Sequence, residues 1–135
     1  MNQQVAINSS HDVIRARKLG RECARGLGLG LAAQTRLATA ISELARNVLY
    51  YAGSGTCTFV EGDPTSTRQR LQVIVEDCGP GIPDIEQAMS SGFSTGASLG
   101  VGLPAARRLV HGFTLESRPG LTRVTLTTLG SKAVP

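Results

Sequence analysis

Apolar residues recur with helical spacing along two segments in the first half of the chain. They occur every three or four positions in His11–Gly26 and, after a glycine-rich break, in Leu31–Ala52. This spacing places the apolar residues on one face of a helix. In the second segment that face consists of Leu37, Ile41, Leu44 and Val48. We therefore predict two amphipathic helices that bury their apolar faces in a core.

The remaining segments are rich in residues typical of strands and turns. Strands are predicted at Val5–Ile7, Thr56–Glu61, Gln69–Asp77, Phe113–Ser117 and Thr122–Thr128. Turn-forming residues between the second and third of these indicate an antiparallel hairpin. Between the third and fourth we predict a short helix (Asp84–Met89), a loop (Ser90–Gly100) and a helix (Pro104–His111), and we expect the tail Ser131–Pro135 to be frayed. The order favours an α/β (α+β) two-layer sandwich, with helices on one face of a mostly antiparallel sheet.

Length and composition restrict the organisation of the protein. A chain of 135 residues with 41% hydrophobic and 18% charged residues is typical of one globular domain, so we do not expect a multidomain enzyme. We take residues 1–135 as this domain. Glycine is in excess, with 16 residues. Six of them lie in the 24 residues 79–102, where average usage would place about two. This concentration marks a candidate site.

Charge and cysteine content narrow the range of partners. The net charge of +4 suits an acidic partner or a polyanion, but two lysines and five aromatic residues offer no platform for stacking bases, so we expect no nucleic-acid partner. Arg17, Arg21 and Arg25 share one helix face, which is either solvated or a docking surface. Three cysteines without a CxxC motif fit neither a disulfide framework nor zinc. With a polar N-terminus and no apolar run of about 20 residues, the chain is expected to be cytoplasmic and not to bind membranes.

Three short motifs follow one another in a fixed order. Glu43-Leu-Ala-Arg-Asn47 lies on a predicted helix, Asp77-Cys-Gly-Pro-Gly81 follows a predicted strand, and Leu99-Gly-Val-Gly-Leu-Pro104 precedes a predicted helix. Each is weak evidence alone, because helix margins are often solvated and glycine turns often have no ligand. Together they contain the groups that a nucleotide site requires.

The glycine-containing motifs supply the binding groups. Gly100 and Gly102 allow the backbone to approach a phosphate, and the N–H groups of a following helix point toward it. Asp77, at the end of a buried strand, can accept a hydrogen bond from the amino group of adenine. Gly79 and Gly81 keep the wall of that pocket thin enough for a flat ring.

The helical motif supplies the groups for chemistry. Asn47 offers a carbonyl oxygen to Mg²⁺, and Glu43, one turn away, can accept the proton of an attacking hydroxyl. Residues 90–99 have the composition of a mobile lid over the phosphates.

The three motifs resemble the N, G1 and G2 boxes of the GHKL ATPase superfamily, over residues 5–128. The phrases VEDCGPGIPDIEQAM, GFSTGASLGVGLPAARRLV and GLTRVTLT further resemble its RsbT-type switch kinases. The resemblance implies a histidine-kinase-like ATPase fold with bound ATP and Mg²⁺. It makes Glu43 the catalytic base and Asn47 the Mg²⁺ ligand. The implied nucleotide-binding residues are Asn47, Asp77, Gly79, Gly81, Ser94, Thr95, Gly100, Val101, Gly102, Leu103 and Thr122.

The resemblance also implies a function. It predicts a serine/threonine kinase that transfers the γ-phosphate of ATP to STAS-domain partners and, when released from them, activates a PPM-type phosphatase. The alternative is an anti-sigma factor with kinase activity toward an anti-anti-sigma STAS protein. A detached ATPase domain of a sensor histidine kinase is disfavoured, because His11 lacks the flanking two-helix dimerisation pattern. Two residues depart from the family pattern, namely Val101 at a common leucine position and Cys78 at a common acidic or small position.

Overall fold

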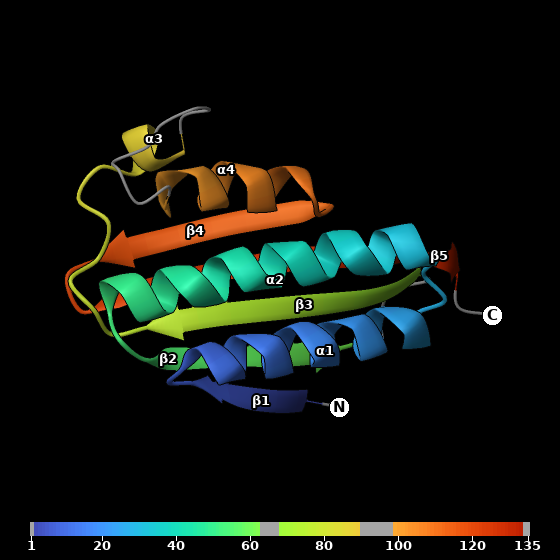
Figure 1. The fold of residues 1–135 in the computed structure, drawn as a ribbon. Coiled ribbons are helices and arrows are strands. Elements are labelled where there is room, and N and C mark those ends of the chain that lie inside the picture. Colours follow the sequence, from blue (N-terminus) through green and yellow to red (C-terminus); the bar gives the residue numbers. More distant parts are fainter. Residues whose placement is uncertain (1, 63–67, 90–98, 134–135) are drawn as a thin grey trace.

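The computed structural model describes residues 2–62, 68–89 and 99–133, which form one sheet and a layer of helices. The elements are β1 (Asn2–Ile7), α1 (Ser10–Gly26), α2 (Leu31–Tyr51), β2 (Gly55–Glu61), β3 (Arg68–Asp77), α3 (Ile85–Ala88), α4 (Leu99–Arg108), β4 (Gly112–Arg118) and β5 (Leu121–Ala133). The strand order is β1-β2-β3-β5-β4, and every neighbouring pair is antiparallel. Figure 1 shows α1, α2 and α4 lying over the same face of this sheet. The predicted two-layer sandwich is confirmed.

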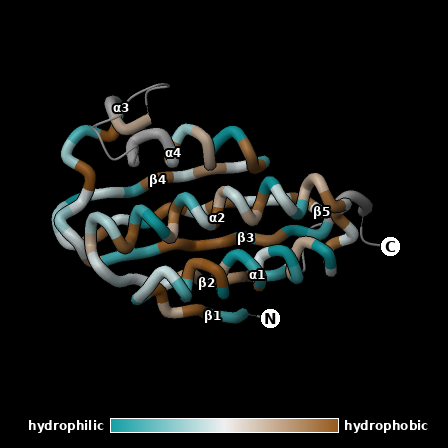
Figure 2. Tube along the Cα trace, viewed as in Figure 1, coloured by the Kyte–Doolittle hydropathy of each residue, from teal (hydrophilic) through white to brown (hydrophobic). Residues whose placement is uncertain are grey.

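The core lies between the sheet and the helix layer. Inward-facing residues of the central strands, such as Phe59, Val73 and Leu126, are at most 1% exposed. The predicted apolar face of α2 is buried against them. In Figure 2 the hydrophobic residues form a continuous band along β3, whereas α1 carries many hydrophilic residues. No helix among residues 2–62, 68–89 and 99–133 is long and apolar enough to cross a membrane.

The helices α1 and α2 form an antiparallel pair that packs closely at one glycine. A Cβ atom at Gly20 would run into Cδ1 of Ile41, so the backbone of α1 approaches α2 at this point. This contact sets how the two helices are aligned along their axes, with Gly20 opposite Ile41.

Three elements differ most from the expectation. Residues 99–103, predicted as loop and helix entry, form the first turns of α4, which ends at Arg108 instead of His111. The buried residues Leu103 and Ala106 explain the early start, because packing outweighs the low helix propensity of the two glycines. Strand β1 begins at Asn2, since an edge strand needs backbone pairing and no apolar side chains. Strand β5 continues to Ala133, which pairs with Arg68, so the expected frayed tail is wrong up to that residue.

Gly55 permits a close approach that the sequence did not indicate. A Cβ atom there would overlap the carbonyl oxygen of Glu76 and lie 2.7 Å from Cγ1 of Val48. We expect Gly55→Ala to lower the free energy of unfolding by about 1–3 kcal/mol, because the neighbouring atom is backbone and cannot move aside easily. Urea titration of both forms measures this loss. Gly26→Ala, where nothing lies within 4 Å, is the control and should be neutral or stabilising. Equal stability of the two variants would contradict the prediction.

Candidate functional site

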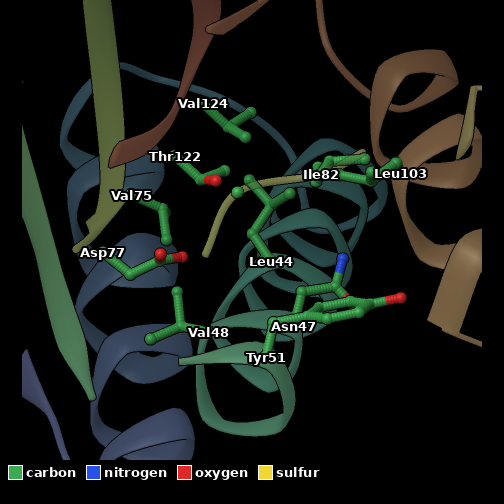
Figure 3. Close-up of a pocket in the computed structure, with 11 residues that line it drawn as sticks. Leu44, Asn47, Val48, Tyr51, Val75, Asp77, Ile82, Leu103, Thr122 and Val124 are labelled. Atoms are coloured by element: carbon green, nitrogen blue, oxygen red, sulfur yellow. The ribbon is translucent and has the colours of Figure 1, made fainter. Parts of the chain in front are cut away.

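A pocket opens between α2, the ends of β3 and β5, and the turn that follows β3. It is a narrow cavity of about 30 Å³ that opens to solvent on one side. Its walls are mainly apolar, with three polar side chains among them. The lining residues are Leu44, Asn47, Val48, Tyr51, Val75, Asp77, Gly81, Ile82, Leu103, Thr122 and Val124. Figure 3 shows these side chains converging from the helix and the strands.

Asp77 is the buried acid of this pocket. It ends β3 opposite Thr122 of β5, and only 7% of the residue is exposed. Its Oδ1 atom accepts a hydrogen bond of 2.9 Å from the backbone N–H of Gly79. Burial raises the pKa of the Asp77 carboxyl above its usual range, and the Gly79 N–H acts in the opposite direction. The carboxyl group points into the pocket (Figure 3), where it can accept a hydrogen bond from a ligand.

The two glycines after Asp77 have different tasks. Gly81 lines the pocket, and its φ of +84° is a left-handed conformation that favours glycine. Gly79 does not line the pocket. A Cβ atom at Gly79 would lie 2.7 Å from Cβ of Ala52, so this glycine allows the turn to pack against the end of α2. Cys78, between Asp77 and Gly79, is exposed and makes no disulfide.

Thr122 belongs to a hydrogen-bond chain that holds the pocket wall. The backbone N–H of Ile82 donates to Oγ of Ser117 at 2.7 Å, and this oxygen lies 2.8 Å from Oγ1 of Thr122. These two hydrogen bonds connect the turn after β3 to β4 and β5. Neither Ser117 nor Ile82 was predicted. Their signal in the sequence is indirect: Ser117 and Thr122 flank the Pro119-Gly120 turn and are direct cross-strand partners.

Glu43 and Asn47 meet the start of α4 at the side of the pocket. A Cβ atom at Gly102 would lie 2.9 Å from Oε2 of Glu43 and 3.6 Å from Nδ2 of Asn47. A Cβ atom at Gly102 would therefore displace the Glu43 carboxylate and come into van der Waals contact with the Asn47 amide. Glu43 also forms an ion pair of 3.1 Å with Arg46 on the same helix. The three sequence motifs are thus brought together in space.

The Asn47 amide is buried without a partner. Its Nδ2 atom makes no hydrogen bond to any residue that the structure describes. An unsatisfied buried polar group costs about 1–3 kcal/mol, so such a group needs a ligand or a function. Rotation of the amide by half a turn places Oδ1, a suitable Mg²⁺ ligand, in the same position. Within the described ranges no three His, Cys, Asp or Glu side chains form a group that could hold a metal ion.

The predicted phosphate-binding residues lie only partly in the described structure. Gly100, Val101, Gly102 and Leu103 belong to the first turns of α4, and not to a loop before the helix as predicted. The backbone N–H groups of a first helical turn lack intrahelical partners and carry the positive end of the helix dipole. Leu103 is buried and lines the pocket. Ser94 and Thr95, and with them most of the predicted lid, fall outside the described residues.

Tyr51 is a further lining residue that the sequence did not single out. It lies one turn beyond Asn47 on α2, is 41% exposed, and packs edge-to-face on Tyr50 with ring centroids 5.1 Å apart. Figure 3 places its ring beside Asn47 at the margin of the pocket. The spacing Leu44, Asn47, Val48, Tyr51 is the sequence signal, because it marks one helix face.

The fold and the motifs match known proteins. Residues 32–131 match the family described as Histidine kinase-, DNA gyrase B-, and HSP90-like ATPase. The serine/threonine-protein kinase RsbT of Bacillus subtilis (strain 168) is 48% identical over 122 residues, which are 89% of this chain and 91% of that protein.

Solved structures agree on the fold. The catalytic domain of histidine kinase ThkA has a TM-score of 0.54 at 19% identity, over 93% of this chain and 96% of that one. The histidine kinase domain of a blue-light activated histidine kinase from Erythrobacter litoralis has a TM-score of 0.55 at 19% identity, over 88% of this chain. This chain spans 63% of that domain, which is less than two thirds of its length.

The family match covers most of the chain, the similarity to RsbT extends over nearly all of it, and the fold agrees with both. The chain therefore belongs to the Histidine kinase-, DNA gyrase B-, and HSP90-like ATPase family, among its RsbT-type members.

Proposed function

We propose that this protein is a serine/threonine kinase that transfers the γ-phosphate of ATP to a hydroxyl group of a partner protein. The observation that carries the proposal is the position of Glu43 and Asn47 around Gly102, beside the Asp77 pocket. A carboxylate that can accept a proton and an amide that can bind Mg²⁺ thereby lie beside the start of α4, where we place the phosphates. The name of its relative RsbT, a serine/threonine-protein kinase, supports the same reaction.

The pocket is proposed to hold the adenine ring. Its apolar walls suit a flat ring, and the Asp77 carboxylate accepts the N–H of the adenine amino group. Thr122, held by Ser117, and Gly81 complete the wall beside Asp77. Gly79 acts through the turn and not by contact with the ring.

The phosphates are proposed to lie against the start of α4. Backbone N–H groups in the first turn of α4, at Gly100 and Val101, donate to phosphate oxygens, and the helix dipole favours their negative charge. Gly102 and Leu103 are proposed to contact the nucleotide from the next turn. Ser94 and Thr95 are proposed to add hydroxyl donors. Asn47 would hold Mg²⁺, which when bound offsets the negative charge of the phosphates.

Glu43 is proposed to act as the general base. Its carboxylate accepts the proton of the serine or threonine hydroxyl as that oxygen forms a bond to the γ-phosphorus. The bond between the γ-phosphorus and the bridging oxygen breaks, and the electron pair leaves with ADP. Arg46, paired with Glu43 at 3.1 Å, restrains the carboxylate in place.

The proposed partners are those of a signalling switch. STAS-domain proteins serve as substrates and hold the kinase, and its release activates a PPM-type phosphatase in the cytoplasm. We propose that the whole chain acts as one domain. An anti-sigma factor remains the alternative, which a pull-down separates: retention of a sigma factor, instead of a phosphatase regulatory domain, would favour it. The similarity to RsbT supports the first assignment.

Asn47→Leu tests the assignment of Asn47 and the kinase activity together. We expect transfer of labelled phosphate from Mg-ATP to a STAS-domain partner to fall by at least about 100-fold. The free energy of unfolding of the ligand-free protein should stay equal or rise, because leucine has a volume similar to that of asparagine and lacks its unsatisfied buried amide.

The control is Asn8→Ala at an exposed position, which should leave both quantities unchanged. No label transfer by the wild type would overturn the kinase assignment. Undiminished transfer by Asn47→Leu would overturn the role of Asn47.

A further inference from the structure

A second concavity lies between α1 and α2, away from the adenine pocket. It has a volume of about 510 Å³ and is lined by Ile14, Arg17, Lys18, Arg21, Ala38, Thr39, Ser42, Glu43 and Arg46. We call it the α1/α2 groove. Its lining residues on α1 follow the spacing of a single helix face, so the groove runs along the helix pair.

The groove is strongly basic. Four of its lining side chains are cationic (Arg17, Lys18, Arg21 and Arg46), and Glu43 is the single acid. Arg46 is paired with that acid. Arg17, Lys18 and Arg21 form no ion pair with any residue in the described ranges. Three uncompensated positive charges line one surface, which therefore attracts a negatively charged ligand.

The groove passes the proposed catalytic base. Glu43 lines the groove and also touches the position of Gly102 at the start of α4. Because Gly20 lies opposite Ile41 in an antiparallel pair, Arg17 lies close to the level of Glu43. A chain lying in the groove therefore passes beside Glu43, whose side chain is 32% exposed.

An apolar residue, Ile14, lies at one end of the groove, about one turn along α1 from Arg17. Ile14 is 50% exposed although it lines the concavity. A half-exposed isoleucine beside cationic side chains suits a peptide with one apolar residue among acidic ones.

We propose that the α1/α2 groove binds an acidic peptide segment of the partner protein and delivers its serine or threonine hydroxyl to Glu43. Acidic side chains of the segment pair with Arg17, Lys18 and Arg21. The proposal rests on the kinase function proposed above and adds the substrate class: a hydroxyl residue flanked by aspartate and glutamate. Salt weakens the interaction, because the pairs are solvent-accessible.

The test uses a fluorescein-labelled synthetic peptide with one serine between runs of aspartate and glutamate. A second peptide carries asparagine and glutamine instead. Anisotropy with the full chain and a non-hydrolysable ATP analogue gives the dissociation constants, and Mg-ATP gives the rate of phosphorylation. We expect the acidic peptide to bind at least about tenfold more tightly than the amide peptide.

The matched variants are Arg17→Glu and Arg21→Glu in the groove, and Arg25→Glu, which carries the same charge change on α1 outside it. Each groove variant should weaken binding of the acidic peptide about tenfold and raise its KM, while Arg25→Glu should stay near wild type. Affinity for the ATP analogue should be equal in all forms, which shows that each variant is folded.

The outcomes separate the two proposals. Equal affinity for the acidic and amide peptides would overturn the proposal that the groove binds an acidic segment. So would an Arg25→Glu variant that binds the acidic peptide as weakly as the groove variants do. Binding that depends on Arg17 and Arg21 without phosphate transfer to any acceptor would leave the groove standing and overturn the kinase function. Phosphate transfer to the acidic peptide that is unchanged in Arg17→Glu and Arg21→Glu would overturn the groove proposal and leave the kinase function standing.

Discussion

Replacing Glu43 by glutamine is expected to lower the rate of phosphate transfer about a thousandfold, within the range that positioned general bases contribute. Glutamine has nearly the same shape but cannot accept the proton of the acceptor hydroxyl. Gly102 should still pack against residue 43. The atom of Glu43 nearest to Gly102 is Oε2, and glutamine has an oxygen or a nitrogen of similar size at that position. The affinity for ATP should therefore change little.

Single-turnover kinetics with labelled ATP measures the transfer step, and fluorescence titration with an ATP analogue measures binding. Glu22→Gln, at an exposed position of α1 outside the groove, is the control and should behave as wild type. A Glu43→Gln rate within tenfold of wild type would assign the proton transfer to another group.

Asp77→Asn should weaken nucleotide binding by about 10- to 100-fold, because a hydrogen bond to a charged group contributes about 1.5–3 kcal/mol. The same variant should be more stable than wild type at neutral pH. Burial raises the pKa of Asp77 in the folded protein, so the folded state resists ionisation of this carboxyl. At low pH, where Asp77 is protonated in both the folded and the unfolded protein, the wild type loses no stability. It loses stability as the pH rises through the folded-state pKa of Asp77.

The stability difference between Asp77→Asn and wild type should therefore be small near pH 4 and grow toward pH 7. Urea unfolding at both pH values measures it, and titration with an ATP analogue gives the affinity. Glu22→Gln, exposed on α1, is the control for both. A difference in stability that does not vary with pH would show that the Asp77 carboxyl is not held in an unfavourable environment.

The helices and central strands were predictable because their signal is local. The apolar face of α2 is one continuous pattern, and the four predicted residues are at most 3% exposed. Strand β3 is an apolar run that ends at Asp77, as predicted. In these segments propensity, periodicity and burial all favour the same structure.

The start of α4 was not predictable from local signals. Gly100 and Gly102 lower helix propensity, and Pro104 indicated a helix start at its own position. Burial of Leu103 and Ala106 decides the outcome, and this burial depends on the packing of distant segments. The polar residues at the beginning of β1 were missed for a related reason, since they are ordered by pairing with β2.

The motifs indicated the candidate site, but not its supporting contacts. Glu43, Asn47 and Asp77 could be selected because acids and amides near glycine-rich turns are informative in sequence. Ser117 and Ile82 could not, because their importance lies in one hydrogen bond between residues 35 positions apart. The unpartnered state of the Asn47 amide likewise appears only when all its neighbours are in place.

Different residues of helix α2 line the pocket and the groove, and the two concavities approach each other at Asn47 and Glu43, one turn apart. Leu44, Val48 and Tyr51 line the first, and Ala38, Thr39 and Ser42 line the second. The two share no lining residue, so an adenine ring in the pocket and a segment in the groove do not compete for the same space. If both proposals hold, no order of addition is imposed by steric exclusion, and ADP can be exchanged for ATP while a partner stays bound. Kinetically this arrangement corresponds to a random sequential mechanism, in which the lifetime of the protein complex and the turnover of the nucleotide are set independently.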